Sequence, residues 1–118
     1  MRATSEKPLS ARGGSGAVRE RCPVARTLSM IGDRWTILIL RDLLRDGPRR
    51  FHDFERSLAG ISPNTLSARL KALEDHGIVE RQFYEEHPPR AEYVLTDKGM
   101  QLGPVLKALR EWGQRHTT

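Results

Sequence analysis

The apolar residues that follow residue 22 have a helical spacing up to residue 77 and an alternating spacing after it. The longest apolar run lies at residues 37–40, and large apolar side chains occupy most positions of residues 34–45. A helix that is apolar on nearly all sides is buried in the middle of a domain. Residues 34–45 are therefore predicted to form the central core helix.

Capping residues and helix breakers mark where the helices begin and end. Pro23 and Pro63 suit a first helical turn, because proline has no N–H to leave unpaired there. Asp33 and Ser62 are suited to cap the helices that follow them. The predicted helices span residues 23–30, 34–45, 51–57, 63–76 and 97–115.

The predicted helix at residues 63–76 has two different faces. Leu66, Leu70 and Leu73 recur at helical spacing and mark a buried stripe. A helix that enters the major groove of DNA, about 12 Å wide, needs small or hydrogen-bonding side chains on its open face. The alternative is an ordinary amphipathic surface helix. The residues away from the stripe or at its margin are Asn64, Thr65, Ser67, Ala68, Arg69, Lys71 and Ala72.

After Gly77 the sequence predicts a β-hairpin. Residues 78–85 and 91–95 alternate between apolar and polar positions, which indicates two strands. Pro88 and Pro89 are expected in the connecting loop, because proline cannot donate to a sheet ladder.

The last predicted helix, which Thr96 caps, carries an apolar stripe. This stripe is more apolar than the end of a chain needs, so it favours contact with a second copy of the protein. The alternative is packing against its own domain alone. The stripe consists of Leu102, Val105, Leu106, Leu109 and Trp112.

Two short helices around a glycine-containing turn, followed by a two-stranded ribbon, are the element order of a winged helix-turn-helix. The predicted fold is mainly α with a small two-stranded β-wing, in one domain over residues 22–118. A chain of 118 residues has too little interior for a second domain.

The composition favours an anionic partner. A formal net charge of +5 and a pI near 10.0 fit binding to nucleic acid or to an acidic membrane surface. No stretch reaches the ~20 apolar residues of a membrane helix. Residues 1–21, with five basic and two acidic residues, are predicted to form a disordered basic arm. The cations of the folded part must then be gathered on one face.

Two arginines precede the predicted helix at residues 51–57. Arg49 and Arg50 stand where the positive helix end and two guanidinium groups favour a phosphate. The alternative is a solvated charge pair.

No residue pattern predicts catalysis or a bound metal. The four histidines are scattered, with no second ligand three or four residues away. There is no Gly-x-Ser-x-Gly motif, and the N-terminal glycines lack the context of a nucleotide-binding loop. We therefore expect no enzyme activity, no cofactor and no metal site.

Cys22 is the only cysteine, which excludes an internal disulfide and, with no secretory signal, indicates a cytoplasmic protein. It precedes a helix start and has Arg19, Arg21 and Arg26 nearby in sequence. These conditions stabilise a thiolate, so Cys22 is a candidate redox or electrophile sensor. The alternative is a buried, inert structural cysteine.

Several separate motifs occur along the chain in the order of one family. The sequence resembles the HxlR-type family of bacterial transcriptional regulators from residue 22 to about residue 112. Its Gly-Asp-Arg-Trp run at residues 32–35 departs slightly from the more usual Gly-Gly-Lys-Trp, but Arg34 keeps the cation. The motifs are Cys22-Pro23, the run at residues 31–44, Gly47-Pro48-Arg49-Arg50-Phe51, the run at residues 61–70 and the run at residues 88–99.

The resemblance implies a homodimer held by the first and last helices, and a recognition helix at residues 62–76 that contacts bases. It also implies that the loop at residues 88–90 contacts the DNA backbone or the minor groove. In several members the cysteine that matches Cys22 resembles a redox or electrophile switch. The predicted DNA-binding residues are Arg34, Arg49, Arg50, Ser62, Asn64, Thr65, Ser67, Ala68, Arg69, Lys71 and Arg90. The predicted interface residues are Val24, Leu28, Leu102, Val105, Leu106, Leu109 and Trp112.

We expect a sequence-specific regulator that binds a palindromic operator in double-stranded DNA and represses a nearby gene. A second hypothesis is a sensor whose DNA affinity answers to a small-molecule or electrophile inducer. A third is a protein-interaction module with the same fold. A protein-interaction module would show no affinity for duplex DNA that falls steeply with salt concentration.

Overall fold

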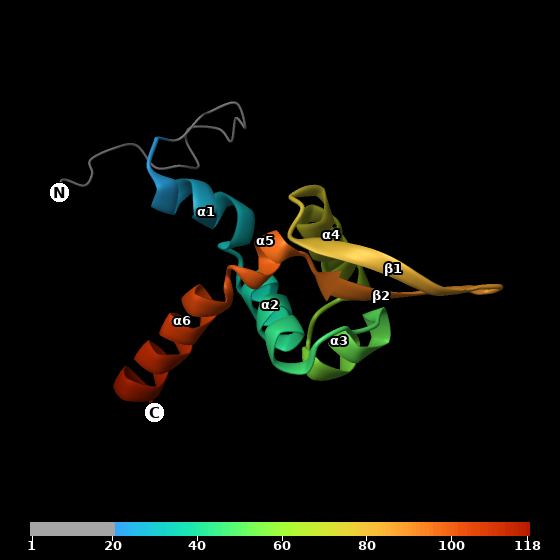
Figure 1. Cartoon of the computed structure of the whole chain (residues 1–118). Coiled ribbons are helices and arrows are strands. Elements are labelled where there is room, and N and C mark those ends of the chain that lie inside the picture. Colours follow the sequence, from blue (N-terminus) through green and yellow to red (C-terminus); the bar gives the residue numbers. More distant parts are fainter. Residues whose placement is uncertain (1–20) are drawn as a thin grey trace.

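The computed structural model describes residues 21–118, so all but the last residue of the predicted arm at residues 1–21 lies outside the described part of the chain. The element order is that of the predicted winged helix-turn-helix (Figure 1). The elements are α1 (Pro23–Ile31), α2 (Arg34–Asp46), α3 (Phe51–Ser57), α4 (Pro63–Asp75), β1 (Val79–Glu86), β2 (Pro89–Leu95), α5 (Asp97–Met100) and α6 (Gly103–His116).

Three polar side chains cap helices as the sequence predicts. The carboxylate of Asp33 accepts a hydrogen bond from the backbone N–H of Thr36 at 3.1 Å, at the start of α2. Ser62 does the same at the start of α4, and Thr96 at the start of α5. Each cap satisfies a backbone donor that the first helical turn leaves unpaired.

The core lies around α2, as predicted. Ile39 and Leu40 have no exposed surface, and they pack in one cluster with Phe54 of α3 and with Leu66 and Leu70 of α4. In Figure 1, α2 runs through the middle of the molecule, with α3 and α4 beside it. The apolar surface that α2 presents therefore positions the helix-turn-helix.

One charged side chain is enclosed by this core. Asp42 of α2 has no exposed surface. Its carboxylate accepts hydrogen bonds from the guanidinium groups of Arg41 and Arg45 and from the hydroxyl of Ser57. The buried charge is thus paired and hydrogen-bonded, and the bond to Ser57 fastens α3 to α2.

The two strands form an antiparallel wing that is longer than predicted. The pairing runs from Val79 opposite Leu95 to Glu86 opposite Pro89, with an irregularity between Phe83 and Glu85. Pro89 is therefore the first residue of β2, and its expected place in the loop is wrong. A proline is tolerated there because the first residue of an edge strand need not donate to the ladder.

The single last helix that the sequence predicts is divided into α5 and α6. A Cβ atom at Gly99 would lie 2.3 Å from the carbonyl oxygen of Ile78, so only glycine allows this close approach. Pro104 stands in the first turn of α6, where its missing N–H costs nothing, whereas inside one long helix it would remove a hydrogen bond.

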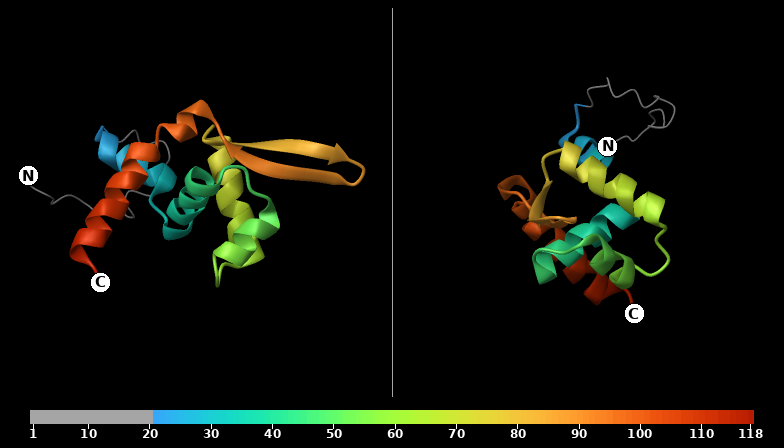
Figure 2. Two further views of the ribbon diagram at one scale, coloured as in Figure 1. Left: turned by 60° about the horizontal axis from the view of Figure 1, so that its bottom comes forward. Right: turned by 90° about the vertical axis from the view of Figure 1, so that its right-hand side faces the viewer.

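The wing and the terminal helices lie at opposite ends of the molecule. Figures 1 and 2 show the hairpin extending from one end and α1 with α6 at the other. Within residues 21–118, no helix is both long enough and apolar enough to cross a membrane.

Candidate nucleic-acid interface

Helix α4 buries one side and leaves the other open. Leu66, Leu70 and Leu73 are buried in the core. The opposite side carries four of the predicted DNA-binding residues, all exposed: Asn64, Ser67, Ala68 and Lys71. The short side chains of Asn64, Ser67 and Ala68 allow the helix to approach base edges closely.

Ser62 and Thr65 are tied to each other at the start of α4. The hydroxyl of Ser62 donates to the Thr65 hydroxyl at 3.0 Å and accepts from the Thr65 backbone N–H at 3.1 Å. This pair sets the direction of the first turn of the recognition helix. The two hydroxyls keep acceptor capacity for a further donor.

Arg69 is held by the start of α2. Its Nε atom lies 2.9 Å from Oδ2 of Asp33, which joins the middle of α4 to the cap of α2. Burial by itself raises the pKa of Asp33, but hydrogen bonds from Thr36 and Arg69, with the charge of Arg69, leave that pKa below its ordinary value. Arg69 therefore fixes α4 relative to the start of α2.

Arg34 stands beside this bridge, at the start of α2. Its guanidinium lies 4.6 Å from the centre of the Trp35 ring, and the residue is exposed. Stacking on an indole holds a guanidinium in place without taking up its hydrogen-bond donors. Arg34 is thus suited to a phosphate at the flank of α4.

The two arginines before α3 have different surroundings. The side chain of Arg49 is only 16% exposed, forms an ion pair with Asp46 and donates to the carbonyl oxygen of Asp53 at 3.2 Å. Its backbone also pairs with Tyr93 of β2 in both directions. Arg49 therefore joins the α2–α3 connection to the wing.

Arg50, in contrast, is open to solvent. Its side chain is 52% exposed and donates to the hydroxyl of Tyr84 on β1 at 3.2 Å. A hydrogen bond from the backbone N–H of Arg50 is the main reason why the pKa of Asp53 is lowered. The Nε atom of Arg50 also lies 3.9 Å from the Asp53 carboxylate, but Arg50 is the more exposed of the two arginines and the better candidate for a phosphate contact.

The wing is acidic, which the sequence reasoning overlooked. Residues 79–95 contain four glutamates and two arginines, a net charge of −2. Arg90, near the tip, is half-exposed and its Nε lies 3.1 Å from a carboxylate oxygen of Glu85. An acidic ribbon is repelled by phosphates, so contact with DNA would depend on Arg90 leaving Glu85.

Tyr84 was also missed as a candidate. An exposed tyrosine on an alternating strand is the signal that could have suggested it, because its hydroxyl can position Arg50 or donate to a phosphate. Arg56, exposed on α3, is a second missed cation. In the part of the chain that the structure describes, no three His, Cys, Asp or Glu side chains are grouped so as to hold a metal ion.

A family model described as HxlR-like helix-turn-helix matches residues 30–118. The chain belongs to this family. An uncharacterized HTH-type transcriptional regulator of Halalkalibacterium halodurans is 44% identical over 94 residues, which are 80% of this chain and 83% of the relative. The predicted family and the predicted fold are both confirmed.

Two solved structures share the fold of this HxlR-like chain. The redox regulator HypR in its oxidized form is 37% identical, with a TM-score of 0.76 over 82% of this chain and 99% of HypR. The diamide-treated YodB of Bacillus subtilis is also 37% identical, with a TM-score of 0.66 over 85% of this chain and 99% of YodB. The chain is accordingly a DNA-binding transcriptional regulator with a winged helix-turn-helix.

The contrast between Arg49 and Arg50 leads to a first test. We expect Arg50→Ala to weaken binding to all DNA sequences alike and to reduce the slope of log affinity against log salt by about one. Arg49→Ala should instead lower the free energy of unfolding by about 1–3 kcal/mol, because it removes the ion pair with Asp46 and the hydrogen bond to the carbonyl oxygen of Asp53. Anisotropy titrations at several salt concentrations and urea unfolding measure the two effects. An Arg49→Ala protein of unchanged stability with a flattened salt slope would contradict this assignment.

Proposed function

We propose that this HxlR-like protein is a homodimeric repressor that binds a palindromic operator. The observation that carries the proposal is the open face of α4, where Asn64, Ser67 and Ala68 stand clear of the core. Side-chain amides and small side chains of this kind recognise base edges in the major groove. Lys71, Arg34 and Arg50 flank that face with positive charge.

An uncovered apolar surface supports the dimer. Val24 on α1 is 67% exposed and Trp112 on α6 is 61% exposed. A groove of about 340 Å³ lies between these helices. It is lined by Pro23, Val24, Thr27, Leu28, Ile31, Ile37, Val105 and Leu109. A contiguous apolar patch of this kind on a small protein marks a contact with another molecule.

Two of the residues predicted for the interface are less exposed than the others. Leu102 and Leu106 are half-buried and pack against the core of their own domain. We therefore base the proposed dimer interface on five exposed residues, which we call the α1–α6 face: Val24, Leu28, Val105, Leu109 and Trp112. A second copy placed on this face about a two-fold axis covers the same residues in both chains.

The two-fold symmetry determines the form of the operator. The α1–α6 face and the wing are at opposite ends of the protein (Figure 2). A dimer joined through the α1–α6 face therefore leaves the wing of each subunit uncovered, and each subunit presents its own α4 to the DNA. Two recognition helices related by a two-fold axis contact half-sites one helical turn apart, about 34 Å. Occupancy of such a site beside a promoter blocks transcription, which a reporter gene with the operator in place measures directly.

The dimer can be tested on α6. We expect Val105→Glu to convert the dimer to a monomer, because it places a charge in an apolar contact. Gln114→Glu adds the same charge to an exposed position of α6 outside the α1–α6 face, so this control should remain dimeric. Sedimentation of both variants at micromolar concentration distinguishes them. A dimer that survives Val105→Glu would show that another surface joins the subunits.

Base recognition can be tested on α4. Replacement of Asn64 by alanine should remove about 1–3 kcal/mol of discrimination at one base pair of each half-site. Lys71→Ala is the matched control on the same face, because loss of a phosphate contact weakens all sequences alike. Competition binding with operators mutated at single positions measures both. An Asn64→Ala protein that keeps the full base preference would place the recognition residues elsewhere.

We also propose that Cys22 couples the protein to oxidants or electrophiles. The thiol is exposed at the cap position of α1, two residues before Val24 of the α1–α6 face. Two of the similar structures are a redox regulator in its oxidized form and a diamide-treated protein. A modification at the start of α1 would lie beside the dimer contact and could alter the angle between the two recognition helices.

The Cys22 proposal can be tested by treatment with diamide or a quinone. Operator affinity of the wild-type protein should fall, whereas a Cys22→Ser variant should keep its affinity under the same treatment. Mass analysis establishes that Cys22 carries the modification. If the wild-type protein is fully modified at Cys22 and binds the operator as before, the thiol does not act as a switch.

A further inference from the structure

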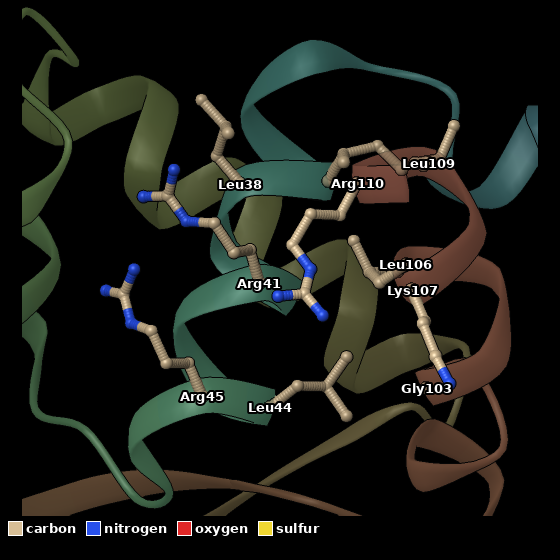
Figure 3. A pocket seen from close by; sticks show the side chains of 10 residues that line it. Leu38, Arg41, Leu44, Arg45, Gly103, Leu106, Lys107, Leu109 and Arg110 are labelled. Atoms are coloured by element: carbon tan, nitrogen blue, oxygen red, sulfur yellow. The ribbon is translucent and has the colours of Figure 1, made fainter. Parts of the chain in front are cut away.

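A second groove runs along the other side of α6, between that helix and α2 (Figure 3). Its volume is about 550 Å³, within the range of small-molecule sites in proteins. Five lining residues are apolar and four are cations. The apolar ones are Ile37, Leu38, Leu44, Leu106 and Leu109, and the cations are Arg41, Arg45, Lys107 and Arg110.

Two of the four cations of this groove have an acidic partner in the described part of the chain, and two have none. None of the described residues that line it is acidic. Arg41 and Arg45 share the buried carboxylate of Asp42, at 2.9 and 3.2 Å, and Arg45 is also paired with Asp46 at 3.0 Å. Among residues 21–118, neither Lys107 nor Arg110 has an ion-pair partner, and in Figure 3 the Arg110 side chain reaches from α6 toward α2.

One residue that lines the groove has no side chain. Gly103 stands at its base in the first turn of α6, and a Cβ atom there would meet only the side chain of Leu44, at 3.8 Å. Helix α6 buries none of its own residues completely. The walls therefore leave room for an apolar group beside Leu44 and Leu106.

This groove is distinct from the proposed dimer contact. Val24, Leu28, Val105 and Trp112 line no part of it, and the two grooves share only Ile37 and Leu109 among the described residues. A second copy on the α1–α6 face would leave the cations of the α2–α6 groove accessible.

We propose that the α2–α6 groove binds a small amphipathic organic anion, with an aromatic or aliphatic body and a carboxylate. The body would cover Leu38, Leu44 and Leu106. The carboxylate would lie on the planar guanidinium of Arg110, which can donate two parallel hydrogen bonds to it. The apolar floor and the uncompensated charge together select such a molecule over a neutral or an inorganic one.

The regulatory consequence rests on the proposed function. Helix α2 carries the core contacts that hold α4, whereas α6 carries the dimer contact. A ligand between α2 and α6 changes the angle between the recognition helices of the two subunits. The ligand then has different affinities for the free protein and for the DNA-bound protein, because the two binding equilibria are linked.

The binding itself is tested on the full chain without DNA, by calorimetry with 2-naphthoate as the probe. The neutral 2-naphthalenemethanol has the same ring system and is the matched control. We expect the carboxylate to bind about tenfold or more tightly than the alcohol. Arg110→Gln should remove that preference, whereas Arg115→Gln, on α6 but outside the groove, should retain it.

A second variant tests the location without a change of charge. Gly103→Val should fill the base of the groove and reduce the affinity for 2-naphthoate about tenfold, with the helix content and the sedimentation of the wild type. Equal binding of the two probes, naphthoate affinity that is unaffected by Arg110→Gln and Gly103→Val, or no binding at about 1 mM would overturn the proposal. If a second copy of the protein covers the groove, no binding of 2-naphthoate will be observed. Because no DNA is present, failure here leaves the repressor proposal standing, and failure of operator binding leaves this site standing.

Discussion

Burial of Ile39, Leu40 and Leu43 on α2 against the leucines of α4 is the contact on which the rest of the structure depends. It holds α4 against the core, because Leu66, Leu70 and Leu73 are the buried residues of that helix. The same helix supplies Asp33 to hold Arg69 and Asp42 to hold Ser57 of α3. Hydrophobic burial provides most of the stability, and these two carboxylates determine the direction in which α3 and α4 lie.

Helix α6, unlike α4, packs against this core only near its start. It is anchored near its start, where Leu102 and Leu106 pack inward, and the rest of its apolar surface stays uncovered. One side faces α1 and is almost wholly apolar, whereas the other faces α2 and has a cationic rim. The first is suited to a second copy and the second to an organic anion. Placing both on one helix provides a physical route between a bound ligand and the geometry of a dimer.

Some arginines of the domain form ion pairs within the protein, and others are available to bind a partner. Arg49 and Arg69 are engaged by Asp46 and Asp33, so their charges are largely compensated within the protein. Arg34 and Arg50 retain free donors at the surface. The wing carries a net negative charge, so phosphate contacts should concentrate on α2, α3 and α4.

The sequence by itself determined the elements, their order and the core. Helix caps, prolines and the spacing of leucines act over a few residues, which is why Asp33, Ser62 and Leu66 have the roles that the pattern predicts. The close approach of Gly99 in α5 to the carbonyl oxygen of Ile78 is a tertiary contact, and no local pattern predicts it. Likewise, only the tertiary structure shows that the side chain of Arg49 is mostly buried and that of Arg50 exposed. It also shows that Leu106 packs against the core whereas Val105 is exposed. Whether a side chain is free depends on partners distant in sequence, and burial is a property of the assembled fold.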